Sequence, residues 1–333
     1  MSPQSSRSFV SVVIRSLNRL PNVLEIIEVC LEQDYDEFEV VVVDQSDEGN
    51  WMKYGASFEG LDSRVSVVRS EPLGPSGARN MGVSNSKGDL VLFIDDDDLP
   101  IGQDWISCHA RHYKDPLCVG VSGRYVHRSK EPVRYRRRDL AYRRCLSYSF
   151  FLRGWDYTGI DRVKQPVEWL HGSNASVRKS YVVRAGGWYP YLSDFEEHSF
   201  AFALRRVMKP GEYLMFDPRP ETVRRYNVPG GLERRRAPLS RLVRHHLEYY
   251  HWVVSKYFPF RFYLLYPLFM IHVFRFSRRW FLRYSRQKDN AWIRLFGKKY
   301  GMRLYILFEL VKFPFSVASF VFRKRPKWSG SLT

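Results

Sequence analysis

The apolar run Leu90–Ile94 leads directly into four consecutive aspartates, Asp95–Asp98, and this junction constrains the fold more than any other segment. An unbroken apolar run of this length is typical of a strand buried on both faces, as in a parallel sheet. Four carboxylates cannot continue into an apolar core, because burying unpaired charge is too unfavourable. We therefore expect the strand to end at an open sheet edge, where cations neutralise the aspartates.

Oxygen ligands packed as densely as those of Asp95–Asp98 suit Mg²⁺ or Mn²⁺, and these ions in turn bind phosphate oxygens. A solvated acidic turn is the alternative explanation for such a run. Open α/β sheets bind their ligands at the carboxyl ends of the strands, which is where these aspartates would lie. The position therefore favours a metal–phosphate site.

The first half of the chain alternates strand and helix patterns. Strands are predicted at 9–14, 38–43, 65–68 and 90–94, and helices at 18–32, after a loop at 74–77, and at 103–113. This alternation predicts βαβ units and an α/β fold that is Rossmann-like, with a mostly parallel sheet flanked by helices. Further helices are predicted at about 139–151 and 195–207, and from residue 239 onward the helices mix aromatic with basic side chains.

The net charge of +18 is concentrated at one end of the chain. Residues 1–130 hold 13 basic and 20 acidic residues, whereas residues 235–333 hold 21 basic and 3 acidic ones. A basic nucleic-acid-binding protein would spread its positive residues along a groove of the folded domain, so this distribution argues against a nucleic-acid partner. We expect a catalytic domain over residues 1–235 and an amphipathic, basic helical region over residues 236–333 that associates with a membrane surface.

Two apolar stretches lie in that C-terminal region, at 262–274 and 304–322. The first is short and contains Pro267, and the second contains Glu309 and Lys312, so neither is a comfortable membrane span. Their basic flanks favour binding at the membrane surface. A helical subdomain packed on the catalytic domain is the alternative.

The four cysteines form no C-x-x-C pair and no ligand-like spacing with histidine, which argues for a reducing compartment and against zinc. The short polar N-terminus does not read as a signal peptide. We therefore expect a cytoplasmic protein, peripheral on the inner face of the cell membrane.

Two further acidic positions follow the same logic. Asp44 ends the second predicted strand, so a parallel sheet would bring it to the edge that carries Asp95–Asp98. Capping of a turn is the alternative for Asp44 alone. Glu196 and Glu197 begin a predicted helix, where the helix dipole alone would also favour acidic residues.

Taken in order, these segments resemble the inverting family 2 glycosyltransferases, over roughly residues 9–207. The resemblance implies a GT-A fold, a nucleotide-sugar donor, a divalent metal bound through a D-x-D element, and a single acidic base. The matching segments are Val10–Ile14 with Asn18 and Arg19, Val40–Ser46, Gly77–Gly82, and Phe93–Asp98.

By position, the resemblance implies that Asp44 contacts the nucleoside and that Asn18 and Arg79 lie near the donor. The first loop departs from the family's Pro-Thr/Ser-Tyr-Asn, because it reads Arg15-Ser16-Leu17-Asn18 and lacks the aromatic residue. The resemblance therefore leaves stacking on the nucleobase without a candidate in this loop.

The D-x-D element matches Asp95–Asp97. The resemblance implies that Asp97 is a direct metal ligand, that Asp95 serves both the metal and the donor, and that Asp96 lies near the ribose or the metal. The family's Glu-Asp pair appears as Glu196-Glu197. Glu197 is the expected catalytic base, with Glu196 as the alternative.

The segment His171–Ala175 resembles the family's Gly-x-Asn element, which places Asn174 on the acceptor side. A helix cap is the alternative for these residues. Trp169 and Trp188 are candidates for stacking on sugar faces, although large aromatics are more often core residues. A basic cluster between Arg134 and Arg144 is either a clamp for an acidic or lipid-phosphate acceptor or a solvated face.

We thus expect transfer of a sugar from a nucleotide-diphosphate donor, with UDP favoured, to a hydroxyl of a cell-envelope or lipid-linked glycan. The Q-x-x-R-W motif of processive synthases is not matched, since the nearest stretch, Phe276–Trp280, lacks the glutamine, so we expect non-processive transfer. The alternatives are a nucleotidyltransferase on a related fold, for which Arg15–Pro21 offers no Gly-rich, Lys-containing loop, and a basic nucleic-acid-binding protein.

Overall fold

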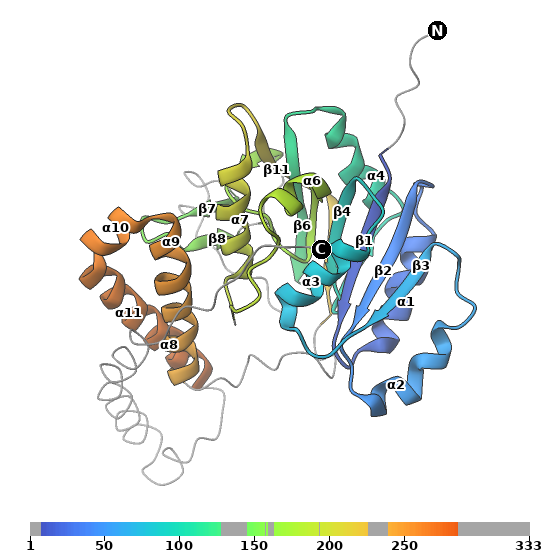
Figure 1. Cartoon of the computed structure of the whole chain (residues 1–333), viewed down its shortest axis with the longest axis horizontal. Helices are drawn as coiled ribbons and strands as arrows, with labels where there is room; N and C mark the ends of the chain where they lie inside the picture. The colour runs from blue at the N-terminus through green and yellow to red at the C-terminus, as the bar shows by residue number, and fades with distance from the viewer. Residues whose placement is uncertain are drawn as a thin grey trace. The chain divides into compact units, whose positions relative to one another are not determined.

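The computed structural model describes residues 8–127, 145–156, 158, 163–192, 194–225 and 239–285 (Figure 1). The chain divides into two compact units. The first comprises Met1–Pro190, Glu196–Gly231 and Trp328–Thr333, and the second comprises Tyr191–Phe195 and Leu232–Lys327.

The first unit is built on a nine-stranded sheet in the order β3-β2-β1-β4-β10-β6-β11-β5, with β9 paired to β11. A separate two-stranded sheet pairs β7 with β8. The strands are β1 (Val10–Ser16), β2 (Phe38–Asp44), β3 (Val65–Arg69), β4 (Leu90–Asp95), β5 (Asp98–Ile101), β6 (Cys118–His127), β7 (Leu146–Tyr148), β8 (Gly154–Asp156), β9 (Gln165–Val167), β10 (Asn174–Arg178) and β11 (Tyr213–Arg224).

Helices cover both faces of this sheet (Figure 1). Helices α1 and α4 pack on one face, and α3, α6 and α7 pack on the other. The helices are α1 (Leu20–Leu31), α2 (Glu48–Tyr54), α3 (Gly74–Asn85), α4 (Trp105–Ala110), α6 (Lys179–Arg184) and α7 (Glu196–Val207).

Alternation along the central strands divides the core in two. In β1, Val12 and Ile14 face α1, whereas Val13 between them faces α3. A Cβ atom at Gly82 of α3 would lie 2.2 Å from Val13 Cγ1. Glycine at this position therefore lets α3 lie directly on β1.

The predicted N-terminal strands are confirmed, and β1 pairs in parallel with both β2 and β4. The later strands make the sheet mixed, because β10 runs antiparallel to β4 and β6, and β11 runs antiparallel to β5. The βαβ units predict a mostly parallel sheet. Among the strands after β4, however, several neighbours are antiparallel, and antiparallel strands need no crossover helix between them.

Three local predictions are corrected. The loop expected at 74–77 is the first turn of α3, where Pro75 suits a helix start. The helix expected at 103–113 is α4 followed by a 3₁₀ turn at Arg111–Lys114. Within the predicted helix at 139–151, the described part contains strand β7, and the remainder lies outside the described residues.

Residues 239–285 of the second unit are mostly helical. They contain α8 (Leu239–Glu248), a π-helical segment (Tyr249–Val254), α9 (Ser255–Tyr257), α10 (Pro259–Leu264) and α11 (Tyr266–Ser285). Phe262, Phe269 and Val273 are buried within this region. Among the described residues, no helix has both the length and the apolarity needed to cross a membrane, and the stretch 304–322 lies outside them.

Candidate active site

Strand pairing brings the predicted site residues to one edge of the sheet. Ser16 at the end of β1 is the register partner of Asp44, and Arg15 is the register partner of Asp95. Asp96 and Asp97 form a turn after β4, and Asp98 begins β5. The carboxyl ends of β1, β2 and β4 therefore meet, as the parallel arrangement predicted.

The aspartate run forms a compact group of carboxylates. Asp95, Asp96 and Asp98 are buried and Asp97 is half-buried. One carboxylate oxygen from each of Asp95, Asp97 and Asp98 lies within 4.8 Å of the others. Three hard oxygen donors at this spacing fit Mg²⁺ or Mn²⁺, so the chemistry of the site is compatible with the metal that the sequence implied.

Arginines from three segments neutralise these carboxylates. Arg15 donates to both oxygens of Asp95, at 2.8 and 2.6 Å. Arg19 Nη1 lies 2.8 Å from Asp96 Oδ1 and 3.1 Å from Asp97 Oδ2. Arg224 at the end of β11 donates to both oxygens of Asp98, at 3.0 and 2.9 Å.

None of these three arginines had a predicted role in the site. A usable signal was present, because a buried acidic run requires facing cations and Arg15 lies one residue before the end of β1, the strand next to β4. The position of Arg224 could not be foreseen, since it depends on the pairing of β11 with β5.

The environments of the aspartates move their pKa values in opposite directions. Burial acts to raise the pKa of Asp95, but the charges of Arg15, Arg79 and Arg224 hold it below its usual range. Burial raises the pKa of Asp98 to about 6 despite the charge of Arg224. Burial likewise raises the pKa of Asp96, although Arg19 opposes the shift.

Arg79 links the aspartates to the glutamate pair. Its buried guanidinium lies 3.2 Å from Asp95 Oδ1 and 3.5 Å from Glu196 Oε1, and it donates to the Gly172 carbonyl at 3.3 Å. The guanidinium carbon also lies 4.5 Å from the centroid of the Trp188 ring. A single side chain of α3 thus touches β4, the segment before β10, and α7.

The two glutamates differ in exposure. Glu196 is buried and paired with Arg79, whereas Glu197 is half-buried. A Cβ atom at Gly172 would lie 2.7 Å from Arg79 Nη2 and 3.2 Å from Glu197 Cγ. Gly172 therefore permits the close approach of both side chains to its backbone.

Asp44 lies at the other end of this edge. It is fully buried, and its Oδ1 accepts a hydrogen bond from the Ser46 amide at 3.0 Å. Its Oδ2 makes no hydrogen bond among the described residues and lies 3.8 Å from Arg69 Nε. A polar group entering beside Asp44 would therefore find an available buried carboxylate oxygen.

Asn18 connects the loops that follow β1 and β2. It adopts a left-handed conformation with φ of 58°, which asparagine tolerates. Its backbone amide donates to Ser46 Oγ at 2.8 Å, and its side-chain Oδ1 accepts from the backbone amide of Asp47 at 2.9 Å. Asn18 thus binds Ser46 and Asp47, which follow Asp44 in the chain, and it orders both loops.

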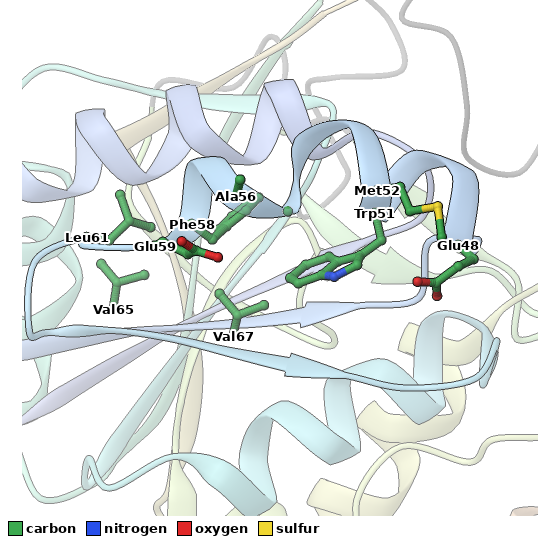
Figure 2. Close-up of a pocket in the computed structure, with 10 residues that line it drawn as sticks. Glu48, Trp51, Met52, Ala56, Phe58, Glu59, Leu61, Val65 and Val67 are labelled. Carbon is green, nitrogen blue, oxygen red and sulfur yellow. The ribbon is translucent and has the colours of Figure 1, made fainter.

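A pocket lies between strand β3, at the edge of the sheet, and the segment formed by α2 and the 3₁₀ turn Gly55–Phe58 (Figure 2). Trp51, Phe58 and Val67 line it. It shares no lining residue with the aspartates, but Arg69 connects the two regions. The Arg69 guanidinium carbon lies 4.4 Å from the Trp51 ring centroid, and Arg69 Nη2 lies 3.2 Å from Glu48 Oε2.

The three residues predicted for the acceptor side are buried. Asn174 begins β10 rather than preceding a helix; its Oδ1 accepts from Trp105 Nε1 at 3.0 Å, and its Nδ2 donates to the carbonyls of Arg124 and Pro220. Trp188 stacks on Phe200, and Trp169 packs edge-on against His198. The structure gives all three a packing role, and their acceptor role stays a prediction. The basic cluster between Arg134 and Arg144 lies outside the described residues.

Residues 11–184 match the family model described as glycosyl transferase family 2. The chain belongs to this family. It is therefore a glycosyltransferase, in agreement with the four-segment resemblance, and the nucleotidyltransferase alternative loses its support.

Relatives match only part of the glycosyltransferase. It is 29% identical over 182 residues to the glucosyl-dolichyl phosphate glucuronosyltransferase of Haloferax volcanii. This match covers 54% of this chain and 55% of the relative. It is 30% identical over 129 residues to the poly(ribitol-phosphate) beta-N-acetylglucosaminyltransferase TarS of Staphylococcus aureus. This match covers 36% of this chain and 22% of TarS. An uncharacterized glycosyltransferase of Rickettsia bellii is 33% identical over 90 residues, which span 27% of this chain and only 13% of that protein.

Solved structures confirm the GT-A fold. A mannosyltransferase from Pyrobaculum calidifontis, in complex with GDP-Man and Mn²⁺, aligns with a TM-score of 0.52 at 17% identity and covers 95% of this chain and 85% of that one. Residues 1–349 of S. aureus TarS, in complex with UDP-GlcNAc, align with a TM-score of 0.52 at 14% identity and cover 92% and 81%.

Proposed function

We propose that the glycosyltransferase is inverting and metal-dependent, and that it transfers one or a few sugars from a nucleotide-diphosphate donor to a glycan or lipid-linked acceptor. One observation carries this proposal. Arg79 joins two groups of carboxylates, with Asp95 on one side and Glu196, next to Glu197, on the other. Such an arrangement supplies carboxylate ligands for a divalent ion that would bind the diphosphate, and a separate carboxylate for the acceptor.

The donor would occupy the edge formed by β1, β2 and β4. Asp44 would accept hydrogen bonds from the nucleobase, with Asn18 ordering the adjoining loops. Asp97 and Asp95 would hold the metal, and Asp96 would lie near the ribose. Bound Mn²⁺ or Mg²⁺ supplies positive charge that stabilises the departing diphosphate.

Glu197 would take the proton of the acceptor hydroxyl. As the acceptor oxygen bonds to the anomeric carbon, the bond from that carbon to the diphosphate oxygen breaks, and the proton passes to the carboxylate. This direct displacement inverts the anomeric centre. Glu197 suits the role better than Glu196 because it is half-buried, whereas Glu196 is buried and paired with Arg79.

The relatives support the class of substrates. The Haloferax relative is named for a glucosyl-dolichyl phosphate acceptor, and TarS for a poly(ribitol-phosphate) acceptor. The neighbouring structures hold GDP-Man and UDP-GlcNAc. For this chain we propose a lipid-linked or cell-envelope glycan acceptor and favour a UDP donor.

The second part of the proposal concerns location. We propose that residues 1–235 form the catalytic domain and that residues 236–333 bind the inner face of the cell membrane. On α10, Phe260, Tyr263 and Leu264 are 80%, 70% and 66% exposed. Exposed aromatic and aliphatic side chains within a region of 20 basic and 3 acidic residues suit an anionic lipid surface.

The chemistry is tested with the full chain and a panel of UDP- and GDP-sugars. Thermal shift with and without Mn²⁺ identifies the donor, and NMR of the product assigns the anomeric configuration. We expect one donor to raise the melting temperature only with metal, and the product to have the opposite configuration to the donor. A product that retains the donor configuration, or equal transfer in EDTA, would contradict the proposal.

A further inference from the structure

Arg224 contacts all three carboxylates of the candidate metal site. Its Nη2 lies 2.9 Å from Asp98 Oδ2, 3.3 Å from Asp97 Oδ1 and 3.8 Å from Asp95 Oδ2. These are the same three residues whose oxygens lie within 4.8 Å of one another. A guanidinium nitrogen therefore provides the positive charge that a divalent ion would provide there.

The backbone fixes Arg224 in this place. It ends β11 as the register partner of Asp98 in β5, and the amide of the next residue, Arg225, donates to the Asp97 carbonyl at 2.8 Å. The guanidinium also packs over the Tyr125 ring, 4.9 Å from its centroid. Strand pairing thus holds the backbone of Arg224 beside the aspartates.

The three contacts are unequal. Asp98 is fully buried and binds Arg224 through two hydrogen bonds, whereas Asp97 is half-buried and meets it through one nitrogen. The Arg224 side chain itself is 26% exposed. The arginine can therefore turn away from Asp97 and Asp95 while it remains bound to Asp98.

We propose that Arg224 is an internal counter-ion of the metal site, which a divalent ion must displace from Asp97 and Asp95 in order to bind. This proposal rests on the proposed metal dependence. Because Asp98 keeps the displaced guanidinium nearby, its charge weakens metal binding to the free enzyme. A nucleotide diphosphate brings negative charge that offsets this repulsion, so metal and nucleotide bind cooperatively.

The test measures Mn²⁺ binding to the full chain by electron paramagnetic resonance of free Mn²⁺, without nucleotide and then with UDP. For R224Q we expect at least a tenfold lower Kd for Mn²⁺ without nucleotide, and a smaller gain in affinity when UDP is added. R224K retains the charge and should bind Mn²⁺ as weakly as the wild type.

R219Q is the matched control, since it removes the same charge from the same strand. Arg219 pairs with Asp217 and not with the aspartate run, so R219Q should bind Mn²⁺ with the same Kd as the wild type. An equal gain in R219Q would show a general charge effect and overturn the proposal.

A second measurement needs no folded neutral variant. Titration of the wild type with Mg²⁺ should shift the ¹⁵N–¹H resonance of Arg224 Nε, assigned through R224K, in a saturable manner. Unchanged Mn²⁺ affinity in folded R224Q, or an unmoved Arg224 resonance at saturating Mg²⁺, overturns the counter-ion role alone. Absence of metal binding in both wild type and R224Q, with transfer in EDTA, overturns the metal dependence as well.

Discussion

Arg79 and Glu196 form a buried ion pair, with 3.5 Å between Nη1 and Oε1, across helices α3 and α7. The two residues are separated by 117 positions in the chain. Because Arg79 also binds Asp95, the pair sets the spacing between the acidic edge of the sheet and the start of α7.

This pairing predicts different results for the two glutamates. E197Q should lower kcat by about 10²–10⁴ without changing donor binding, since it removes the proposed base. E196Q should instead lower the melting temperature, because Arg79 loses a buried partner. Steady-state kinetics, donor titration and thermal unfolding separate the two effects. E71Q on the exposed surface is the control, and normal transfer by E197Q with none by E196Q would reverse the assignment.

Asp97 is the most accessible of the clustered aspartates. D97A should raise the Kd for Mn²⁺ at least tenfold and abolish metal-dependent turnover, because it removes a proposed ligand. Isothermal titration with Mn²⁺ in the presence of UDP measures the effect directly. D34A, at an exposed aspartate outside the site, should leave both quantities unchanged, and Mn²⁺ binding by D97A at wild-type affinity would exclude Asp97 as a ligand.

Gly172 lies close to both Arg79 and Glu197. G172A places a methyl group 2.7 Å from Arg79 Nη2 and 3.2 Å from Glu197 Cγ, so we expect kcat to fall at least tenfold and stability to fall by about 1–3 kcal/mol. G49A is the matched control, since the nearest atom to its Cβ would be 3.5 Å away. Kinetics and denaturant unfolding of both variants test this, and full activity in G172A would show that the contact is dispensable.

Buried histidines predict acid destabilisation. Burial lowers the pKa of His109 to about 4 and that of His198 to about 3. Below pH 6.5 the unfolded chain binds protons that the native histidines do not, so the free energy of unfolding falls as the pH drops from 6.5 to 4. The effect is on the order of 1–3 kcal/mol for His109.

Urea unfolding between pH 4 and 8 measures this slope, which should be shallower in H109Q. Asp98 works in the opposite direction, since its raised pKa of about 6 favours the native state as pH falls toward 4. D98N should therefore steepen the loss of stability on acidification. A slope that is unchanged in H109Q would contradict the assignment.

The exposed face of α10 and α11 predicts lipid binding. The double variant F260S/L264S should reduce partition onto vesicles of anionic phosphatidylglycerol at least fivefold in co-sedimentation, because it removes exposed apolar side chains. M52S is the control, since Met52 is 77% exposed on α2. Unchanged partition, or a change of oligomeric state without vesicle binding, would assign this face to another partner.

The sequence predicted the parallel half of the fold because its signals are local. Val40–Val43 and Leu90–Ile94 are continuous apolar runs, and the polar residues that follow them mark the edge that holds Asp44 and Asp95. The antiparallel strands carry weaker patterns. Strand β10 begins at Asn174, and asparagine is a residue type that also caps helices, so a helix cap was an equally good interpretation of the sequence. In the structure, the side-chain amide of Asn174 instead donates to the Arg124 carbonyl.

The carboxylates of the candidate site and, by resemblance, Arg79 were predictable, but the other arginines were not. Asp95–Asp98 stand together in the chain, whereas Arg15, Arg19 and Arg224 reach them only through tertiary pairing. The solvent exposure of the two glutamates could not be predicted from the sequence either. The difference between buried Glu196 and half-buried Glu197 arises from how α7 packs.

The pairing of Arg224 with Asp98 spans 126 residues, so the acidic edge is complete only after β11 has joined β5. Contacts between such distant residues form slowly, because loop closure must precede them. Chains that have formed only the first four strands therefore hold Asp95 and Asp97 without the arginine that opposes metal binding. Metal alone should not favour the finished fold over such chains, whereas metal together with the nucleotide donor should raise the yield of refolded enzyme during renaturation.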